Sequence, residues 1–213
     1  MALSKVDFNS INVTPAASKA IKFNSSNNGL ETGDVGGSLV LLSTQTASSS
    51  ATLSFTSGID STYKEYQFHF IDIHPASNNV KLHFNMSADS GSNYNVTKTT
   101  TFFRADHDEA DSATALGYNT SNDLAQSTNF QGLGDIGNDN DQTLSGTLHL
   151  FNPSSTTFVK HFISTTNACD HADESRNYFV AGYGNTTSAI DAVQFKMSSG
   201  NTDSGTIKMY GVT

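Results

Sequence analysis

Apolar and polar residues alternate with a period of two along much of the chain after residue 38. In segment 80–86, Val, Leu, Phe and Met occupy every second position, with Lys, His and Asn between them. A period of two places alternate side chains on opposite faces of a strand, so this segment is predicted to be a half-buried strand. Similar alternation, or a run of β-branched residues, predicts strands at 38–42, 52–55, 66–73, 80–86, 97–104, 144–150, 158–163, 178–183, 193–197 and 207–209.

The alternation changes phase within the third of these strands. Tyr66, Phe68 and Phe70 share one parity, whereas Ile71 and Ile73 have the other. One extra residue in a strand reverses the facing of every residue after it. We therefore predict a β-bulge near Phe70, which bends the strand without ending it.

About ten strands at regular spacing, with turn residues between them, are typical of an antiparallel β-sandwich or jelly roll. We predict an all-β, jelly-roll-like antiparallel sandwich for residues 38–213. The last two strands, 193–197 and 207–209, are expected to pair as a hairpin across the 198–204 loop. Helix is expected only as short turns around 108–115 or 122–127.

Residues 1–37 differ from this body. Their apolar residues are scattered without a sustained period, and segment 25–37 is rich in Asn and Gly. We interpret 1–37 as an N-terminal arm or as docking strands, because an extended strand can add to the sheet edge of a neighbour. A first hairpin of the same domain fits the pattern nearly as well.

The composition supports an all-β protein. Ser, Thr and Asn make up 74 of the 213 residues, and only 15% of residues are charged, compared with about 25% in an average globular domain. These three residue types favour turns and strands over helices, because their side chains hydrogen bond to nearby backbone. With 14 Phe and 7 Tyr as core material, the chain is typical of an extracellular or particle-surface protein rather than a disordered one.

The charge, the apolar runs and the single cysteine exclude nucleic-acid binding, membrane insertion and an internal disulfide. The chain has 11 Lys and Arg against 20 Asp and Glu, and nucleic-acid binding requires a basic surplus, so no nucleic-acid partner is expected. No apolar run approaches the roughly 18 residues of a membrane span, and the N-terminal residues show no signal-peptide pattern. We therefore expect no membrane insertion. Cys169 has no cysteine partner in the chain, so no internal disulfide is expected.

Two acidic clusters that contain histidine are candidate metal sites. The first holds Asp106, His107, Asp108 and Asp111, and the second spans 170–174. Carboxylates and imidazoles are ligands that divalent ions prefer, and both clusters fall in predicted loops. Their spacing matches no metal motif, however, and consecutive loop acids are usually solvated turn residues. We therefore favour turns, with no metal and no cofactor.

Segment 134–141 adds two weaker candidate ligands, Asp139 and Asp141. Counted from Asp139, Leu144 falls where a calcium loop needs glycine. We interpret this segment as a turn whose residues tolerate positive φ. Since the chain also lacks a G-x-S-x-G nucleophile motif and a Gly-rich phosphate loop, we predict no enzymatic activity. A glycan-degrading enzyme with two paired carboxylates stays open as a third alternative, because such pairing is spatial and no sequence pattern shows it.

Several segments resemble small structural proteins of marine tailed bacteriophages, cyanophage-like ones in particular. The resemblance covers nearly the whole chain and rests on NVTPAASKAIKFNS, ATLSFTSGIDSTYKEYQFHFIDIHPAS, TFFRADHDEADSATALGY, LFNPSSTTFVKHF and the closing GTIKMYG. It implies a non-enzymatic, β-rich virion component that is assembled in the cytoplasm of the host bacterium. It carries over no catalytic residues.

This resemblance leads us to expect a virion surface subunit of a tail fibre or tail tip. By analogy it would be a homo-trimer that binds other virion proteins through residues 1–37. Loops 106–122 and 132–141 are expected to contact a host glycan, and Tyr118 is the loop aromatic best placed to stack on a sugar. The alternative is a capsid decoration protein, which stabilises the head with the same fold and anchor but needs no ligand.

Overall fold

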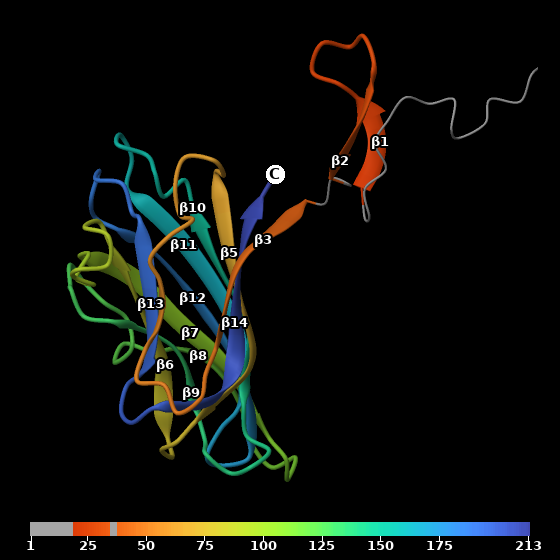
Figure 1. The fold of residues 1–213 in the computed structure, drawn as a ribbon. Coiled ribbons are helices and arrows are strands. Elements are labelled where there is room, and N and C mark those ends of the chain that lie inside the picture. The colour runs from red at the N-terminus through yellow and green to blue at the C-terminus, as the bar shows by residue number, and fades with distance from the viewer. Residues whose placement is uncertain (1–18, 35–37) are drawn as a thin grey trace, which may run out of the picture. The chain divides into compact units, whose positions relative to one another are not determined.

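The computed structural model describes residues 19–34 and 38–213, which form fourteen strands and no helix. The chain divides into two compact units, 1–38 and 39–213. In the first unit, β1 (Lys19–Phe23) and β2 (Leu30–Asp34) pair as an antiparallel hairpin (Figure 1). The rest of the predicted arm, 1–18 and 35–37, lies outside the described residues.

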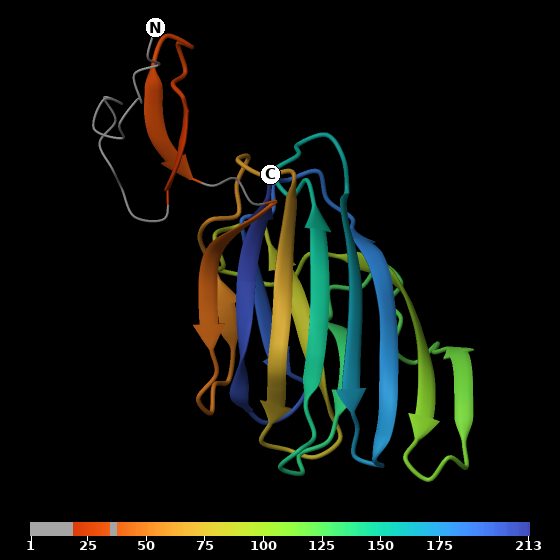
Figure 2. The ribbon, with the colours of Figure 1, turned by 90° about the vertical axis from the view of Figure 1, so that its right-hand side faces the viewer.

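The second unit is built from two antiparallel sheets. The larger has eight strands in the order β3-β14-β5-β10-β11-β12-β7-β8, which Figure 2 shows side by side. The smaller has four strands in the order β4-β13-β6-β9 and lies against the larger (Figure 1). The strand bounds are β3 (Leu39–Thr46), β4 (Leu53–Phe55), β5 (Glu65–Pro75), β6 (Val80–Ser87), β7 (Lys98–Asp108), β8 (Thr114–Tyr118), β9 (Gln131–Ile136), β10 (Leu144–Phe151), β11 (Lys160–Cys169), β12 (Glu174–Gly184), β13 (Ala192–Met197) and β14 (Thr202–Val212).

The core lies between the two sheets. On β6, Leu82, Phe84 and Met86 are fully buried, as the alternation predicts. The half-buried pattern is wrong for Asn85, which is also fully buried because its side-chain amide donates to the carbonyls of Tyr94 and Thr128. The ring of Phe84 contacts that of Phe162 on β11 at 4.8 Å between centroids, so apolar residues of the two sheets interdigitate. The predicted antiparallel β-sandwich is confirmed.

The predicted bulge in β5 is also confirmed. Phe70 is buried, Ile71 and Asp72 are both exposed, and Ile73 is buried again. Asp72 has a φ of 51°, and the register of β5 with β10 shifts between Phe70 and Ile73. The extra residue returns apolar side chains to the core after the bend.

The predicted C-terminal hairpin is wrong. β13 pairs with β4 and β6 in the small sheet, whereas β14 pairs with β3 and β5 in the large one. Both strands direct alternate apolar residues into one core, so they face each other across it. Alternation gives the buried face of a strand but not its hydrogen-bonding neighbour.

The predicted helical turns are also wrong. Segment 108–115 contains a turn and the start of β8, and 122–127 is irregular. Sequence patterns also missed β9, all six residues of which are buried, and β8, all five of which are exposed. Neither strand has one buried and one solvated face, so neither shows a period of two.

Candidate functional site

A hollow of about 560 Å³ lies on the outer face of the small sheet. Lys81 and His83 of β6, Lys196 of β13 and Gly132 of β9 form its floor, and segment 121–130 forms its wall. This hollow contains both charged and aromatic side chains.

The strand pattern explains why these side chains meet. Alternation on β6 buries Leu82 and leaves Lys81 and His83 on the other face. Lys196 is the direct cross-strand neighbour of His83, and Gly132 lies opposite His83 on the other side. A Cβ at Gly132 would lie 3.3 Å from Cδ of Lys81, so the missing side chain keeps the floor of the hollow open.

The hollow has a cationic end. Nζ of Lys81 pairs with Oδ1 of Asp135 at 2.9 Å, while Nζ of Lys196 lies 4.2 Å from the ring centroid of Phe130. Burial lowers the pKa of His83 to about 4, with further lowering by Lys81 and Lys196 that Asp135 partly offsets. At neutral pH His83 is therefore an uncharged imidazole between two ammonium groups, able to donate one hydrogen bond and accept another.

The wall of the hollow is mostly polar, and one of its residues, Asp123, accepts a hydrogen bond from the predicted site residue Tyr118. Tyr118 is 53% exposed on β8, and its hydroxyl donates to Oδ2 of Asp123 at 2.7 Å, which raises its pKa. Asp123 lines the hollow, but Tyr118 itself does not. The prediction that Tyr118 lies in a loop is wrong, since it ends strand β8. Phe130, and not Tyr118, is the aromatic residue that lines the hollow.

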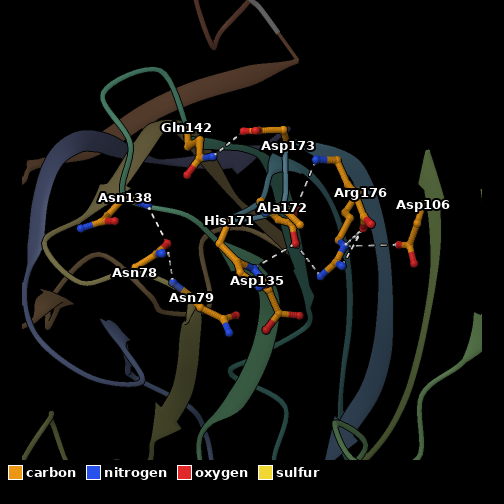
Figure 3. Close-up of polar contacts among 12 residues, drawn as sticks. Asn78, Asn79, Asp106, Asp135, Asn138, Gln142, His171, Ala172, Asp173 and Arg176 are labelled. Atoms are coloured by element: carbon orange, nitrogen blue, oxygen red, sulfur yellow. Dashed lines mark hydrogen bonds and ion pairs between the residues drawn. The ribbon is translucent and has the colours of Figure 1, made fainter. Parts of the chain in front are cut away.

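The two acidic clusters of the sequence come together at one end of the large sheet. Antiparallel pairing of β7 with β12 sets Asp106 opposite Arg176 (Figure 3). Arg176 pairs with Oδ2 of Asp170 at 2.7 Å, with Oε2 of Glu174 at 2.6 Å and more loosely with Asp106 at 3.8 Å. His171 also lies 3.2 Å from Asp170. Arginine lies among these carboxylates, and no group of three or more ligand residues in the described chain is arranged to hold a metal ion.

The other candidate ligands of the first cluster shape a turn. Oδ1 of Asp108 accepts hydrogen bonds from the backbone N–H groups of Ser112 and Ala113, and Asp108 also bonds the Ser112 hydroxyl, which lowers the Asp108 pKa. His107 lies 3.1 Å from the exposed carboxylate of Asp111. The expectation of a loop is wrong for 106–108, which belong to β7.

Segment 134–141 also differs from expectation. Its first three residues belong to the buried strand β9, and none of its residues has positive φ. Asp139 and Asp141 are exposed, and the backbone carbonyl of Asp139 accepts a hydrogen bond from the N–H of Gln142 at 2.9 Å. Both aspartates therefore lie in a tight connection between β9 and β10 rather than around a common centre.

Comparison with known proteins gave no match to a protein-family model, to a curated protein or to a solved structure. No helix among the described residues is long and apolar enough to cross a membrane. The hollow lined by Lys81, His83, Phe130 and Lys196 is therefore the strongest structural basis for a function. Sequence reasoning missed it because its wall comes from an irregular segment, although Lys81 and His83 were already expected to face away from the core.

Proposed function

We propose that the chain is a structural protein of a tailed bacteriophage, exposed on the virion as a tail-fibre or tail-tip subunit that contacts glycans of the host surface. The phage assignment rests on the resemblance of its segments, and an all-β sandwich with a weakly charged surface is compatible with it. The glycan part rests on one observation, the hollow on the outer face of the small sheet.

The chemistry of the hollow suits a sugar. Sugar hydroxyls both donate and accept hydrogen bonds, and Asn122, Asn129 and neutral His83 offer both functions. Lys196 contacts the ring of Phe130 and forms no ion pair within the described residues. Its ammonium N–H groups are therefore available to a ligand, and a sugar that carries a carboxylate or phosphate is expected to bind more tightly than a neutral one.

The test compares binding to host cells between two lysine variants. Lys196→Gln removes the charge in the hollow, and Lys64→Gln removes an exposed charge elsewhere on the body. Saturable binding of the unmodified protein, competed by host polysaccharide, is expected. Lys196→Gln is expected to weaken it about tenfold, since hydrogen bonds to charged groups contribute about 1.5–3 kcal/mol. Lys64→Gln is expected to bind as the unmodified protein does, and equal weakening by both variants would contradict a site in the hollow.

A second candidate function, capsid decoration, is favoured by the β1–β2 hairpin. Ile21, Phe23 and Leu30 on this hairpin are 43%, 71% and 41% exposed, and such apolar side chains are suited to docking on another virion protein. Saturable binding to capsids that lack the protein, at a fixed copy ratio and without binding to cells, would establish decoration. Binding to neither target would contradict both candidate functions.

A further inference from the structure

Lys98 is an unusual lysine because its side chain is fully buried without an acidic partner. It begins β7 on the inner face of the large sheet and has no exposed surface. Its Nζ donates to Oδ1 of Asn85 at 2.6 Å and to the carbonyl of Val96 at 2.7 Å. Within 19–34 and 38–213 no carboxylate forms an ion pair with it.

Burial changes the chemistry of this lysine. Loss of hydration lowers the pKa of Lys98 to about 7, so a large fraction of Nζ is an uncharged amine at neutral pH. An uncharged amine has a free lone pair and is a nucleophile. The group that it contacts, the side-chain amide of Asn85, has an electrophilic carbon.

Asn85 is held in one orientation. It is fully buried on β6, and its Nδ2 donates to the carbonyls of Tyr94 at 2.7 Å and Thr128 at 3.0 Å. Two carbonyl partners require the nitrogen at that position, so the oxygen must face Lys98. Oδ1 also accepts the backbone N–H of Met86 at 2.9 Å. That donor is placed to stabilise negative charge if it develops on Oδ1.

We propose that Lys98 and Asn85 join through an amide bond after the chain has folded. Uncharged Nζ releases its hydrogen bond to Oδ1 and turns its lone pair toward Cγ of Asn85, and a bond forms between Nζ and Cγ. The bond from Cγ to Nδ2 then breaks, one hydrogen passes from Nζ to Nδ2, and Nδ2 leaves as ammonia. The product is a secondary amide that keeps Oδ1 and one hydrogen on Nζ, so no oxidant, reductant or second reactant is needed.

Three features of the fold favour this reaction. Folding holds the two groups in contact, which replaces a bimolecular encounter. The product is a neutral amide, whereas the starting state includes a buried ammonium ion without a counter-charge, which is costly. Departure of ammonia makes the step irreversible in dilute solution. No side-chain acid contacts the pair in the described chain, so Nζ itself supplies the proton and the rate is expected to follow the uncharged fraction of Lys98.

The bond would join the two layers of the sandwich. Asn85 lies on β6 of the small sheet and Lys98 on β7 of the large one, thirteen positions apart in the sequence. A covalent link at this point prevents the sheets from separating there even when the hydrogen bonds around them break. Such a link suits a protein that works on the outside of a particle.

Tryptic digestion of the unmodified protein tests the proposal directly. Lys81, Lys98 and Arg104 are consecutive cleavage sites. Without the bond, trypsin releases peptides 82–98 and 99–104. With the bond, Lys98 is no longer a substrate, and the expected product is one peptide, 82–104, lighter by one molecule of ammonia, with fragment ions that locate the loss to a loop between 85 and 98.

Lys160 is an internal control in the same digest. It is equally buried and pairs with Gly184 on the side away from Lys98. Among residues 19–34 and 38–213, its Nζ donates to the backbone carbonyls of Phe158 and Thr186 and to no side chain. Backbone carbonyls have no leaving group of this kind, so normal cleavage after Lys160 is expected. In a Lys98→Arg variant, cleavage after residue 98 and retention of the Asn85 amide are expected.

The pH dependence of bond formation gives a second readout. In freshly refolded protein the amide is expected to form about tenfold faster at pH 8 than at pH 6, because the uncharged fraction of Lys98 rises through its pKa of about 7. Free peptide 82–98 with an unmodified Asn85, after days of incubation of the folded protein at pH 9, would overturn the proposal. That result needs no variant, so it does not depend on whether a substitution folds.

Discussion

The interior of the sandwich has an apolar half and a polar half, although the same two sheets enclose both. In the apolar half, β5 of the large sheet faces β4 and β13 of the small one. The ring of Phe195 lies within 5.3 Å of the centroids of Phe68 and Phe70 and 6.1 Å from that of Phe55. This half is held by packing of aromatic rings.

The polar half lies where β7, β11 and β12 face β9 and segment 119–130. The Thr100 hydroxyl donates to Oε1 of Gln131 at 2.6 Å, and the Thr166 hydroxyl donates to the carbonyl of Leu133 at 2.6 Å. All of these side chains except that of Leu133 are polar, and all are buried. Buried hydrogen bonds therefore add to apolar packing in this half, where Phe102 and Tyr178 also contact each other at 5.7 Å between ring centroids.

The difference follows from the widths of the two sheets. A four-stranded sheet cannot cover eight strands, and beyond the end of β8 the irregular segment 119–127 pairs with the edge of β7 in the large sheet. Thr100 donates its backbone N–H to the carbonyl of Leu124, and Lys98 donates its own to that of Ser127. An irregular segment at a sheet edge leaves some backbone carbonyls without strand partners, and those carbonyls need other donors. Polar side chains such as Gln131 provide them, with Nε2 bonded to the carbonyls of Asn122 and Gly132.

The largest expected loss of stability comes from a substitution in the apolar half. Phe195→Ala removes a ring that contacts several others and is expected to reduce the free energy of unfolding by about 4 kcal/mol. Urea unfolding measures this value. Phe158→Ala is the control, because Phe158 is 67% exposed and its loss is expected to cost less than about 0.5 kcal/mol. Equal costs would show that the aromatic cluster does not dominate this half.

In the polar half, Arg176→Gln is expected to reduce the free energy of unfolding by about 3 kcal/mol. The substitution leaves the fully buried carboxylate of Asp170 without its arginine partner. The matched control is Arg104→Gln. Arg104 is more exposed and pairs only with Asp106 at 2.9 Å, so a loss of about 1 kcal/mol or less is expected from the same urea experiment. A smaller loss for Arg176→Gln than for the control would mean that the buried network does not stabilise the polar half.

A smaller change in the free energy of unfolding depends on pH and comes from His83, which lies on the outer face of the small sheet. Its pKa is about 4 in the folded protein and 6.5 as a free side chain. As pH falls below 6.5 the unfolded chain binds a proton that the folded protein does not, so the free energy of unfolding decreases until pH 4. Allowing for partial exposure, the loss attributable to His83 is about 2 kcal/mol.

Comparison of the unmodified protein with His83→Gln isolates this contribution, because carboxylates that titrate in the same range are common to both. Urea unfolding at pH 6.5 and pH 4.5 is expected to show a steeper loss for the unmodified protein than for His83→Gln. The groups that act on His83 are Lys81 and Lys196, which lower its pKa, and Asp135, which raises it. Parallel pH profiles would place His83 in a more solvated setting than the hollow provides.

The two halves also differ in how well the sequence predicts them. In the apolar half, alternation over 80–84 and the phase change after Phe70 predicted the buried faces of β6 and β5 correctly, because these stretches bury one face and expose the other. The same patterns did not predict which strands pair with β13. In the polar half β9 buries all six residues, with Gly132 and Gly134 among them, so no alternation marks it. Lys98 lies in a predicted strand, but a sequence pattern does not show that its side chain points inward. The hollow was missed for a related reason, since segment 121–130 has no period that predicts its path.

The smallest expected effect is at the outer edge of the polar half, where β8 has exposed residues throughout. Tyr118→Phe removes only the hydroxyl that donates to Asp123, and a single hydrogen bond at so exposed a position contributes little to stability. Asp123 also lines the hollow, so the substitution frees a carboxylate at its wall. We therefore expect an unchanged urea midpoint but weaker binding of acidic glycans, measured by calorimetry, with neutral glycans unaffected. A loss of stability comparable to that of Arg176→Gln would instead show that β8 is part of the cooperative polar half, and that the boundary between the two halves lies further along the sheet.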